Sequence, residues 1–161
     1  MEELVINSTQ FERNDWIPDC CASYGEDKSP ELHVEGIPTG TVTLAIVMDD
    51  LDHPIQPGFN HWVAWNIPPV HVIPGGLPKG AVVEEPIHME QGIAYGKHCY
   101  RGPKPPFNWN HRYKITIYAL SKNLQLNSET RRDELYEAIG DSILAKGELI
   151  GKYQRKHRRH K

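Results

Sequence analysis

The sequence predicts an all-β protein, an antiparallel β-sandwich of two sheets with short C-terminal helices. Three observations lead to this fold class. Short apolar runs recur between clusters of turn residues. The chain has 13 Gly and 13 Pro among its 161 residues, a content typical of a loop-rich β protein. A helical pattern is confined to the C-terminal third of the chain.

The predicted strands are short apolar segments. The first covers residues 4–11, and residues 15–30 form a long irregular segment with many Asp, Gly, Ser and Pro residues. The β pattern returns after this segment. Further strands are predicted at residues 32–34, 41–49, 61–67, 81–85 and 112–120, and the stretch GELIGKY at 147–153 is the last.

A helix is predicted shortly after residue 129. Thr130 and Asp133 have the T-x-x-D spacing of a capping box, and two apolar residues follow four positions apart. Gly140 is a typical end for this helix. A second short helical turn is expected at residues 143–144.

One domain and a basic tail account for the chain. With 161 residues, the chain can bury roughly 68–70% of its unfolded surface in one core. Six of the 18 Lys and Arg residues lie in the last ten positions, which leaves 12 against 21 Asp and Glu in residues 1–151. We predict a domain at 1–151 and a solvated tail at 152–161. Such a tail can also bind nucleic acid, acidic membrane or an acidic partner, but no nucleic-acid-binding fold accompanies it, and no nucleic acid is expected.

The sequence predicts a cytoplasmic protein without a membrane span. No apolar run approaches the ~18 residues that a membrane helix needs, and the N-terminal stretch is acidic where a secretory signal is basic. The cysteines agree with this location. Cys20 and Cys21 are adjacent and Cys99 is left over, which fits neither a disulfide framework nor a metal knuckle. Reduced thiols are therefore expected.

Polar side chains gather around the turn that follows the apolar run at 41–49. Asp50 and Asp52 end this run, and His61 stands at the entrance of the next predicted strand. Because strand side chains alternate, the two acids point one way and His61 shares a face with core residues such as Val63. Turn chemistry explains single aspartates and packing explains lone histidines, so both interpretations stay open for this stretch alone.

A second polar cluster lies in the later part of the sequence. The loop at 100–106 contains a glycine and three prolines, and it cannot join a β-ladder. His111 and Tyr113 follow, two positions apart, on the same face of the next predicted strand. A second histidine at a strand entrance favours a binding site.

Four short motifs combine in this chain: DxDxP at 50–54, HWxxxN at 61–66, YxGPxPP at 100–106 and HRY at 111–113. In combination they resemble the phosphatidylethanolamine-binding protein family, in its prokaryotic Raf-kinase-inhibitor-like (YbhB/YbcL) branch. The resemblance implies one anion-binding pocket and a cis peptide bond between His53 and Pro54. The ligand-binding residues of this pocket would be Asp50, Asp52, Pro54, His61, Tyr100, Gly102, Pro103, His111 and Tyr113.

The pocket would bind anions through protonated histidines. An acid beside an imidazole favours the protonated form, so Asp50 or Asp52 can hold His61 or His111 ready to donate to an oxyanion. Backbone N–H groups around Gly102 are expected to add uncharged donors. Anion affinity should then rise as the pH falls from about 8 towards 6.

The resemblance implies a non-enzymatic regulator that binds phosphorylated or carboxylated groups and inhibits a kinase or protease as its target. It also implies a homodimer, with no cofactor, no catalytic residue and no bound metal. A metal-dependent hydrolase that uses the His/Asp cluster is the alternative, because two His and two Asp also suit a metal ion. The sequence has neither the HExxH nor the G-x-S-x-G motif of hydrolases.

Overall fold

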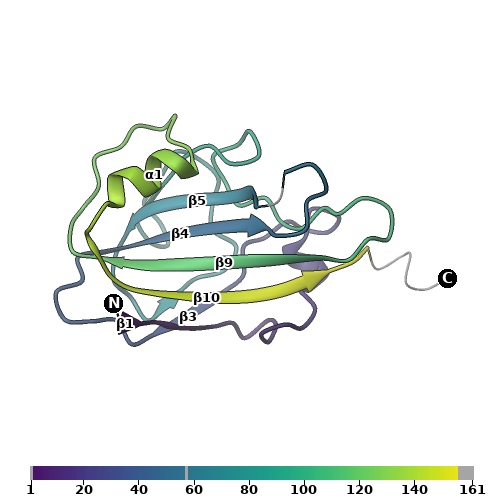
Figure 1. Ribbon diagram of the computed structural model, residues 1–161, viewed down its shortest axis with the longest axis horizontal. Coiled ribbons are helices and arrows are strands. Elements are labelled where there is room, and N and C mark those ends of the chain that lie inside the picture. Colours follow the sequence, from purple (N-terminus) through teal and green to yellow (C-terminus); the bar gives the residue numbers. More distant parts are fainter. Residues whose placement is uncertain (1, 57, 156–161) are drawn as a thin grey trace.

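The computed structural model describes residues 2–56 and 58–155, and Figure 1 shows a molecule built mostly from β-strands. One α-helix and one short 3₁₀ helix accompany the strands of the described residues. The elements are β1 (Glu2–Glu3), β2 (Val5–Asn7), η1 (Asp19–Cys21), β3 (Leu32–Glu35), β4 (Thr43–Asp50), β5 (Phe59–Ile67), β6 (Val72–Ile73), β7 (Val82–Val83), β8 (Met89–Gln91), β9 (His111–Leu120), α1 (Arg132–Ile139) and β10 (Ile143–Tyr153).

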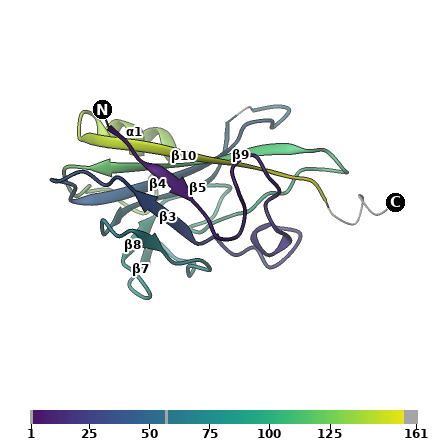
Figure 2. The same cartoon turned by 90° about the horizontal axis from the view of Figure 1, so that it is seen from below.

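The strands form two sheets, which confirms the predicted fold class. The large sheet has seven strands in the order β1-β10-β9-β4-β5-β8-β7, and the small sheet has three in the order β2-β3-β6. Neighbouring strands run antiparallel except β1 and β10, which run parallel. Figures 1 and 2 show α1 on one face of the large sheet and β3 on the other.

Strand β4 lies at the centre of the large sheet, and all eight of its residues are buried. Leu44, Ile46 and Met48 pack in the core between the two sheets. Ala45 and Val47 face the opposite way and belong to the cluster that α1 covers. Because both faces are covered, the sequence of β4 is a continuous apolar run instead of an alternating one.

The strand β5 departs from simple alternation at its first residues. The pairing between β4 and β5 shifts where Met48 pairs with Trp62 and Asp49 pairs with Asn60, which is a β-bulge that contains His61. Val63 and Trp65 pack under α1, whereas His61 packs against Tyr113 of the other face. The expectation that His61 shares a face with Val63 is therefore wrong, and the bulge is the reason.

The described part of the C-terminal third, up to residue 155, contains one helix instead of several. Helix α1 begins after Arg131, whose backbone N–H donates to Glu134 at 2.9 Å, so the helix starts one position later than the predicted box at Thr130 and Asp133. Residues 143–144 already belong to β10, which pairs along its length with β9. The predicted second turn is therefore wrong, because these residues complete the sheet.

Strand β10 continues to Tyr153, past the predicted boundary of the tail at 151/152. The other residues of the predicted tail that the structure describes are Gln154 and Arg155, and residues 156–161 lie outside the described part. None of the helices in the described ranges is long and apolar enough to cross a membrane.

Candidate functional site

A cavity of about 170 Å³ lies at the end of the large sheet where β4 ends and β9 begins. The two strands are antiparallel neighbours, with Asp50 opposite Tyr113, so the end of one and the start of the other meet at the same edge. The loop at 100–106 covers the cavity from the side. Its lining residues are Asp50, His53, Pro54, Ile55, His61, Tyr95, Lys104, Pro106 and His111.

A buried pair of Asp50 and His111 forms one wall of this cavity. The two side chains are 4% and 5% exposed, and His111 Nδ1 lies 2.8 Å from Asp50 Oδ2. The other carboxylate oxygen accepts the backbone N–H of Asp52 at 2.9 Å. Because the carboxylate can only accept, Nδ1 of His111 carries a hydrogen, and Nε2 is the ring nitrogen left for a ligand.

His61 forms the facing wall. Its Nδ1 donates to the carbonyl oxygen of Arg101 at 2.6 Å, which fixes the orientation of the ring. The rings of Phe59, Tyr95 and Tyr113 lie edge-on to it, with centroids 5.7, 5.1 and 5.4 Å away. Burial lowers the pKa of His61, and the nearby carbonyl and acids oppose this only in part. This shift is opposite to the increase that the sequence predicts for a histidine beside an acid.

Asp52 lies outside the cavity, although it was expected to share it with Asp50. Both of its oxygens bind Arg112: the guanidinium Nη2 lies 2.9 Å and Nε 3.0 Å away, and the Arg112 backbone N–H donates at 2.7 Å. These hydrogen bonds, the side-chain ones first, lower the pKa of Asp52 against the opposing effect of burial. Asp52 fastens the turn after β4 to the start of β9.

Gly102 lies behind the cavity wall and offers no free donor. Its N–H donates to the Asp27 carboxylate at 2.7 Å, so the expected backbone donor is already used. A Cβ at this position would lie 2.1 Å from the carbonyl oxygen of Cys21, which explains why the loop needs glycine here. Gly102 therefore positions the loop and does not line the cavity.

Tyr100 and Pro103 also anchor the loop from behind. The Tyr100 hydroxyl donates to the Cys21 carbonyl at 2.7 Å, and the Pro103 carbonyl accepts the Ser23 N–H at 2.9 Å. Tyr113 lies 1% exposed beneath His61, and burial raises its pKa. These three residues shape the site without lining the cavity.

The turn around Pro54 lines the cavity mouth with a trans peptide bond. The cis bond found among the described residues joins Glu85 and Pro86, so the cis bond expected before Pro54 is wrong. His53 stacks on Phe59 with ring centroids 4.7 Å apart, and its Nδ1 accepts backbone N–H groups of the same turn.

Sequence reasoning missed several lining residues, above all Tyr95 and Lys104. Tyr95 has a φ of 54°, an unusual conformation for a residue with a Cβ, and Gly96 follows with a φ of 74°. The Arg101 guanidinium lies 4.7 Å from the Tyr95 ring. Lys104 is the one basic residue that the loop at 100–106 contributes to the lining. The Tyr-Gly dipeptide and the lysine within YxGPxPP were the available signals.

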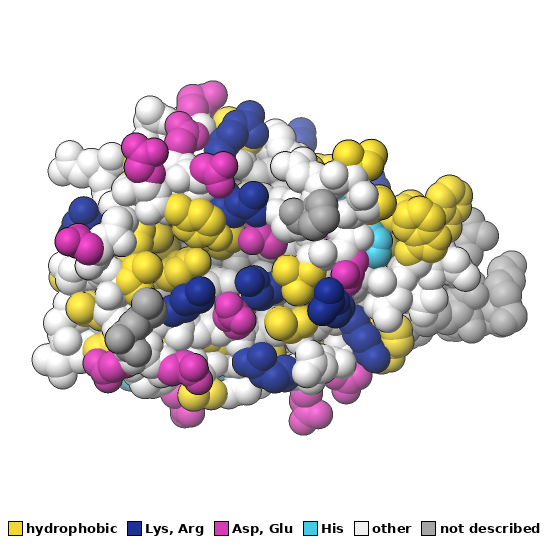
Figure 3. Space-filling view, in the orientation of Figure 1, with side chains coloured by type: hydrophobic (Ala, Val, Ile, Leu, Met, Phe, Trp, Pro, Cys, Tyr) yellow, Lys and Arg dark blue, Asp and Glu magenta, His cyan; other side chains and the backbone are white. Residues whose placement is uncertain are grey.

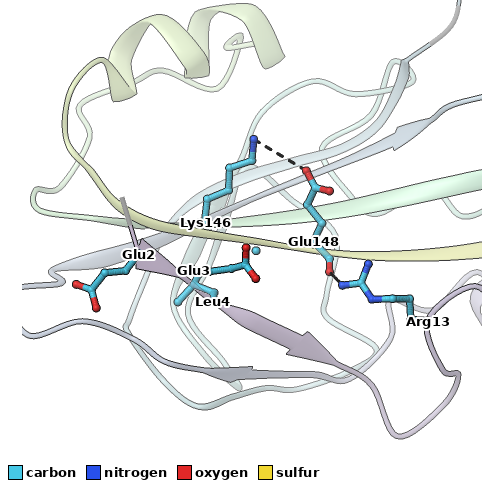
Figure 4. Close-up of a pocket in the computed structure, with 7 residues that line it drawn as sticks. Glu2, Glu3, Leu4, Arg13, Lys146 and Glu148 are labelled. Atoms are coloured by element: carbon cyan, nitrogen blue, oxygen red, sulfur yellow. Dashed lines mark hydrogen bonds and ion pairs between the residues drawn. The ribbon is translucent and has the colours of Figure 1, made fainter.

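A larger hollow of about 630 Å³ lies elsewhere, along β1 and β10 (Figure 4). Its charged groups bind one another: Lys146 Nζ lies 4.0 Å from the Glu148 carboxylate, and Arg13 donates to the Glu148 carbonyl. No buried histidine or unusual acid lies there. We therefore place the candidate site in the smaller cavity.

The residues of the cavity do not form a metal centre. Within residues 2–56 and 58–155, no three His, Cys, Asp or Glu side chains are close enough together to hold a metal ion. The two histidines and Asp50 line one cavity. However, the Asp50 carboxylate is hydrogen-bonded to His111, and the Asp52 carboxylate is hydrogen-bonded to Arg112. The donor set expected for a metal-dependent hydrolase is therefore not assembled by the described residues.

The family profile of phosphatidylethanolamine-binding proteins matches residues 7–154. The chain belongs to the phosphatidylethanolamine-binding protein family. A UPF0098 protein of Pyrococcus abyssi is 43% identical over 157 residues, which cover 96% of this chain and 88% of the relative. The UPF0098 protein YbhB of Escherichia coli is 34% identical over 97 residues, 60% of this chain and 61% of the relative.

A solved structure extends the family likeness to the fold. The crystal structure of the Chlamydia trachomatis protein CT736, described as a phosphatidylethanolamine-binding protein homologue, has a TM-score of 0.84 to this chain. The two are 27% identical, and the match covers 96% of this chain and 99% of the other.

Proposed function

We propose that the protein is a non-enzymatic regulator that binds a phosphorylated or carboxylated group in the cavity between His61 and His111. The observation that supports this most is the buried Asp50–His111 pair, 2.8 Å apart, beside a second buried histidine and Lys104. A buried carboxylate and imidazole that line a cavity are a costly arrangement for packing alone.

The two histidines make anion binding dependent on a proton. In the neutral state, the Nε2 atoms of His61 and His111 carry lone pairs and repel an anion, because both Nδ1 atoms hold the hydrogen. Lys104 is the basic residue of the lining, which also contains the Asp50 carboxylate. An anion therefore enters together with a proton, which turns one Nε2 into a donor.

The cavity size limits what it can enclose. Its volume of about 170 Å³ equals that of about six water molecules at ≈ 30 Å³ each, enough for a phosphate or carboxylate and little more. The remainder of a ligand must lie outside. Ile55, Phe107 and Trp109 are 89%, 63% and 45% exposed, and apolar side chains gather beside a histidine at this end of the molecule (Figure 3). We infer a larger ligand that presents the anionic group at the tip of an apolar or peptide body.

The family suggests how such binding is used. We propose that a kinase or a protease is the target that the protein modulates, and that the chain acts as a cytoplasmic homodimer. Sedimentation equilibrium of the purified chain tests the assembly. An unbiased pull-down that compares wild type with His111→Ala tests the target, since a partner held through the cavity should be lost with the variant.

Calorimetric titration with acetate tests the binding site. Acetate stays ionised between pH 6 and 8, so a change in affinity reports protons taken up by the protein. We expect affinity to rise as the pH falls, by up to about tenfold per unit while one proton enters with each anion. His61→Ala and His111→Ala should each abolish the response, and His88→Ala, whose histidine pairs with Glu84 away from the cavity, should keep it. Equal acetate affinity at pH 6 and pH 8 in the wild type would refute the proposal.

A further inference from the structure

The adjacent residues Cys20 and Cys21 bring their sulfur atoms into contact. The two Sγ atoms lie 3.9 Å apart, and both thiols are free. Adjacent side chains point to opposite faces in a strand, and they lie a third of a turn apart in a 3₁₀ helix. Contact between neighbouring sulfurs is therefore a specific feature of η1 and not a consequence of adjacency.

The backbone around the two cysteines is fixed on both sides. The Cys21 N–H donates to Pro18 at 3.0 Å, and the Cys20 carbonyl accepts the Lys28 N–H at 2.9 Å. The Cys21 carbonyl accepts the Tyr100 hydroxyl at 2.7 Å. The pair is therefore preorganised, so little conformational entropy is lost when one ligand binds both sulfurs.

Gln10 covers the sulfur pair from the solvent side. Its Nε2 lies 3.7 Å from each of the two Sγ atoms, and its Oε1 accepts the Glu31 N–H at 2.7 Å. Gln10 is exposed, Cys20 is partly buried and Cys21 is fully buried. Gln10 is therefore an exposed side chain in contact with both sulfur atoms.

The surroundings favour a ligand that leaves the sulfurs without charge. Burial raises the pKa of Cys21 to about 12, with further contributions from Cys20 and from the carboxylates of Asp27 and Glu26. Thiolates are disfavoured beside these acids. A reagent that condenses with two thiols and gives a neutral product avoids this cost.

We propose that Cys20 and Cys21 form a chelating dithiol site for trivalent arsenicals. A monosubstituted arsenoxide, R–As=O, reacts with both thiols to give two As–S bonds. The arsenic–oxygen bond breaks, the oxygen leaves as water with the two thiol protons, and arsenic stays trivalent. No oxidant or reductant is needed, and the product at the two sulfurs is uncharged.

Titration of the full chain with phenylarsine oxide, followed by intact mass, tests the site. We expect one adduct per chain, formed with loss of one water, in the wild type and in the control Cys99→Ser. Removal of one of two linked donors costs about 10²–10⁴ in avidity, so Cys20→Ser and Cys21→Ala should each bind at least about 100-fold more weakly. Gln10→Ala should bind faster, because the cover over Cys21 is gone.

Two further measurements separate a native dithiol site from ordinary thiol reactivity. The adduct should resist excess glutathione, a monothiol, and yield to dimercaptopropanol, a dithiol. Phenylarsine oxide should also raise the urea midpoint of the wild type, because a ligand that binds the folded state stabilises it. A lowered midpoint, an adduct that glutathione removes, or unchanged affinity in Cys20→Ser would each overturn the proposal.

Discussion

Two neighbouring carboxylates at the end of β4 lie on opposite faces of the large sheet. Asp49 points toward α1, where Arg132 Nη1 lies 2.7 Å and Asn60 Nδ2 lies 3.1 Å from its Oδ1. Asp50 points toward the cavity, where its Oδ2 lies 2.8 Å from His111 Nδ1. One step along the strand therefore separates two acids with different kinds of partner.

The difference between the two pairs lies in the partner of each acid. A guanidinium keeps its charge at any pH that the protein survives, so Asp49 and Arg132 form a permanent link between the sheet and α1. An imidazole can be neutral or cationic, so the pair of Asp50 and His111 is not a permanent ionic link of this kind. The two buried acids therefore differ in the kind of group that each one binds.

The largest effect is expected where the permanent link is broken. Arg132→Ala leaves Asp49, which is 8% exposed, without its cation, and we expect the free energy of unfolding to fall by about 3 kcal/mol. Urea denaturation at pH 7 measures the loss. Arg112→Ala is the matched control, since it removes an arginine from an exposed pair. An equal loss in both variants would contradict the structural role of Arg132.

A smaller effect is expected at the cavity pair. Asp50→Asn keeps the shape of the side chain, but its amide nitrogen must face one of two donors, the Nδ1–H of His111 or the N–H of Asp52. We expect a loss of about 2 kcal/mol, within the range for hydrogen bonds to charged groups, together with loss of acetate binding. Calorimetry and urea denaturation measure the two effects. Retained acetate binding would show that the Asp50 charge is not needed at the site.

The lowered pKa of His61 predicts a pH effect on stability. Above the unfolded value of 6.5 both states hold a neutral ring, and stability does not depend on this group. As the pH falls below 6.5, the unfolded chain takes up the proton first, so stability falls by at most about 1.4 kcal/mol per pH unit until the folded pKa is reached.

His61→Gln isolates this contribution, because glutamine can still donate to Arg101 but does not titrate. Urea denaturation at pH 7.5, 6.5 and 5.5 measures the free energy of unfolding of both proteins. As the pH falls, the wild type should lose stability relative to the variant. A difference that stays constant over this range would mean that His61 titrates normally.

The smallest effect is expected at the exposed pair of Asp52 and Arg112. Their side chains are 32% and 59% exposed, so Arg112→Ala should cost no more than about 1 kcal/mol, and high salt should reduce this value. Because the pKa of Asp52 is lowered, the contribution is present above the unfolded value of 3.8 and is lost as the pH falls through the folded pKa. Thermal unfolding at pH 7 and pH 3, at low and high salt, measures it.

The sequence by itself determined the fold class and one half of the cavity. Apolar runs between turn residues predict the strands, because both kinds of signal are local. His111 and Tyr113 lie two apart on a regular strand, so their shared face followed directly from alternation. The short motifs also indicated where the cavity lies, since they mark the strand ends and the loop that meet there.

Only the tertiary structure decided the rest. A β-bulge places His61 on the cavity side of the sheet. Asp52 lies outside the cavity because its carboxylate binds Arg112, which is distant in sequence. The Gly102 N–H likewise donates to a carboxylate from a distant segment, that of Asp27. Burial lowers the pKa of His61. Each of these outcomes depends on which groups from distant segments lie within hydrogen-bonding distance of an atom and on how deeply that atom is buried. The local spacing of residues in the sequence specifies neither.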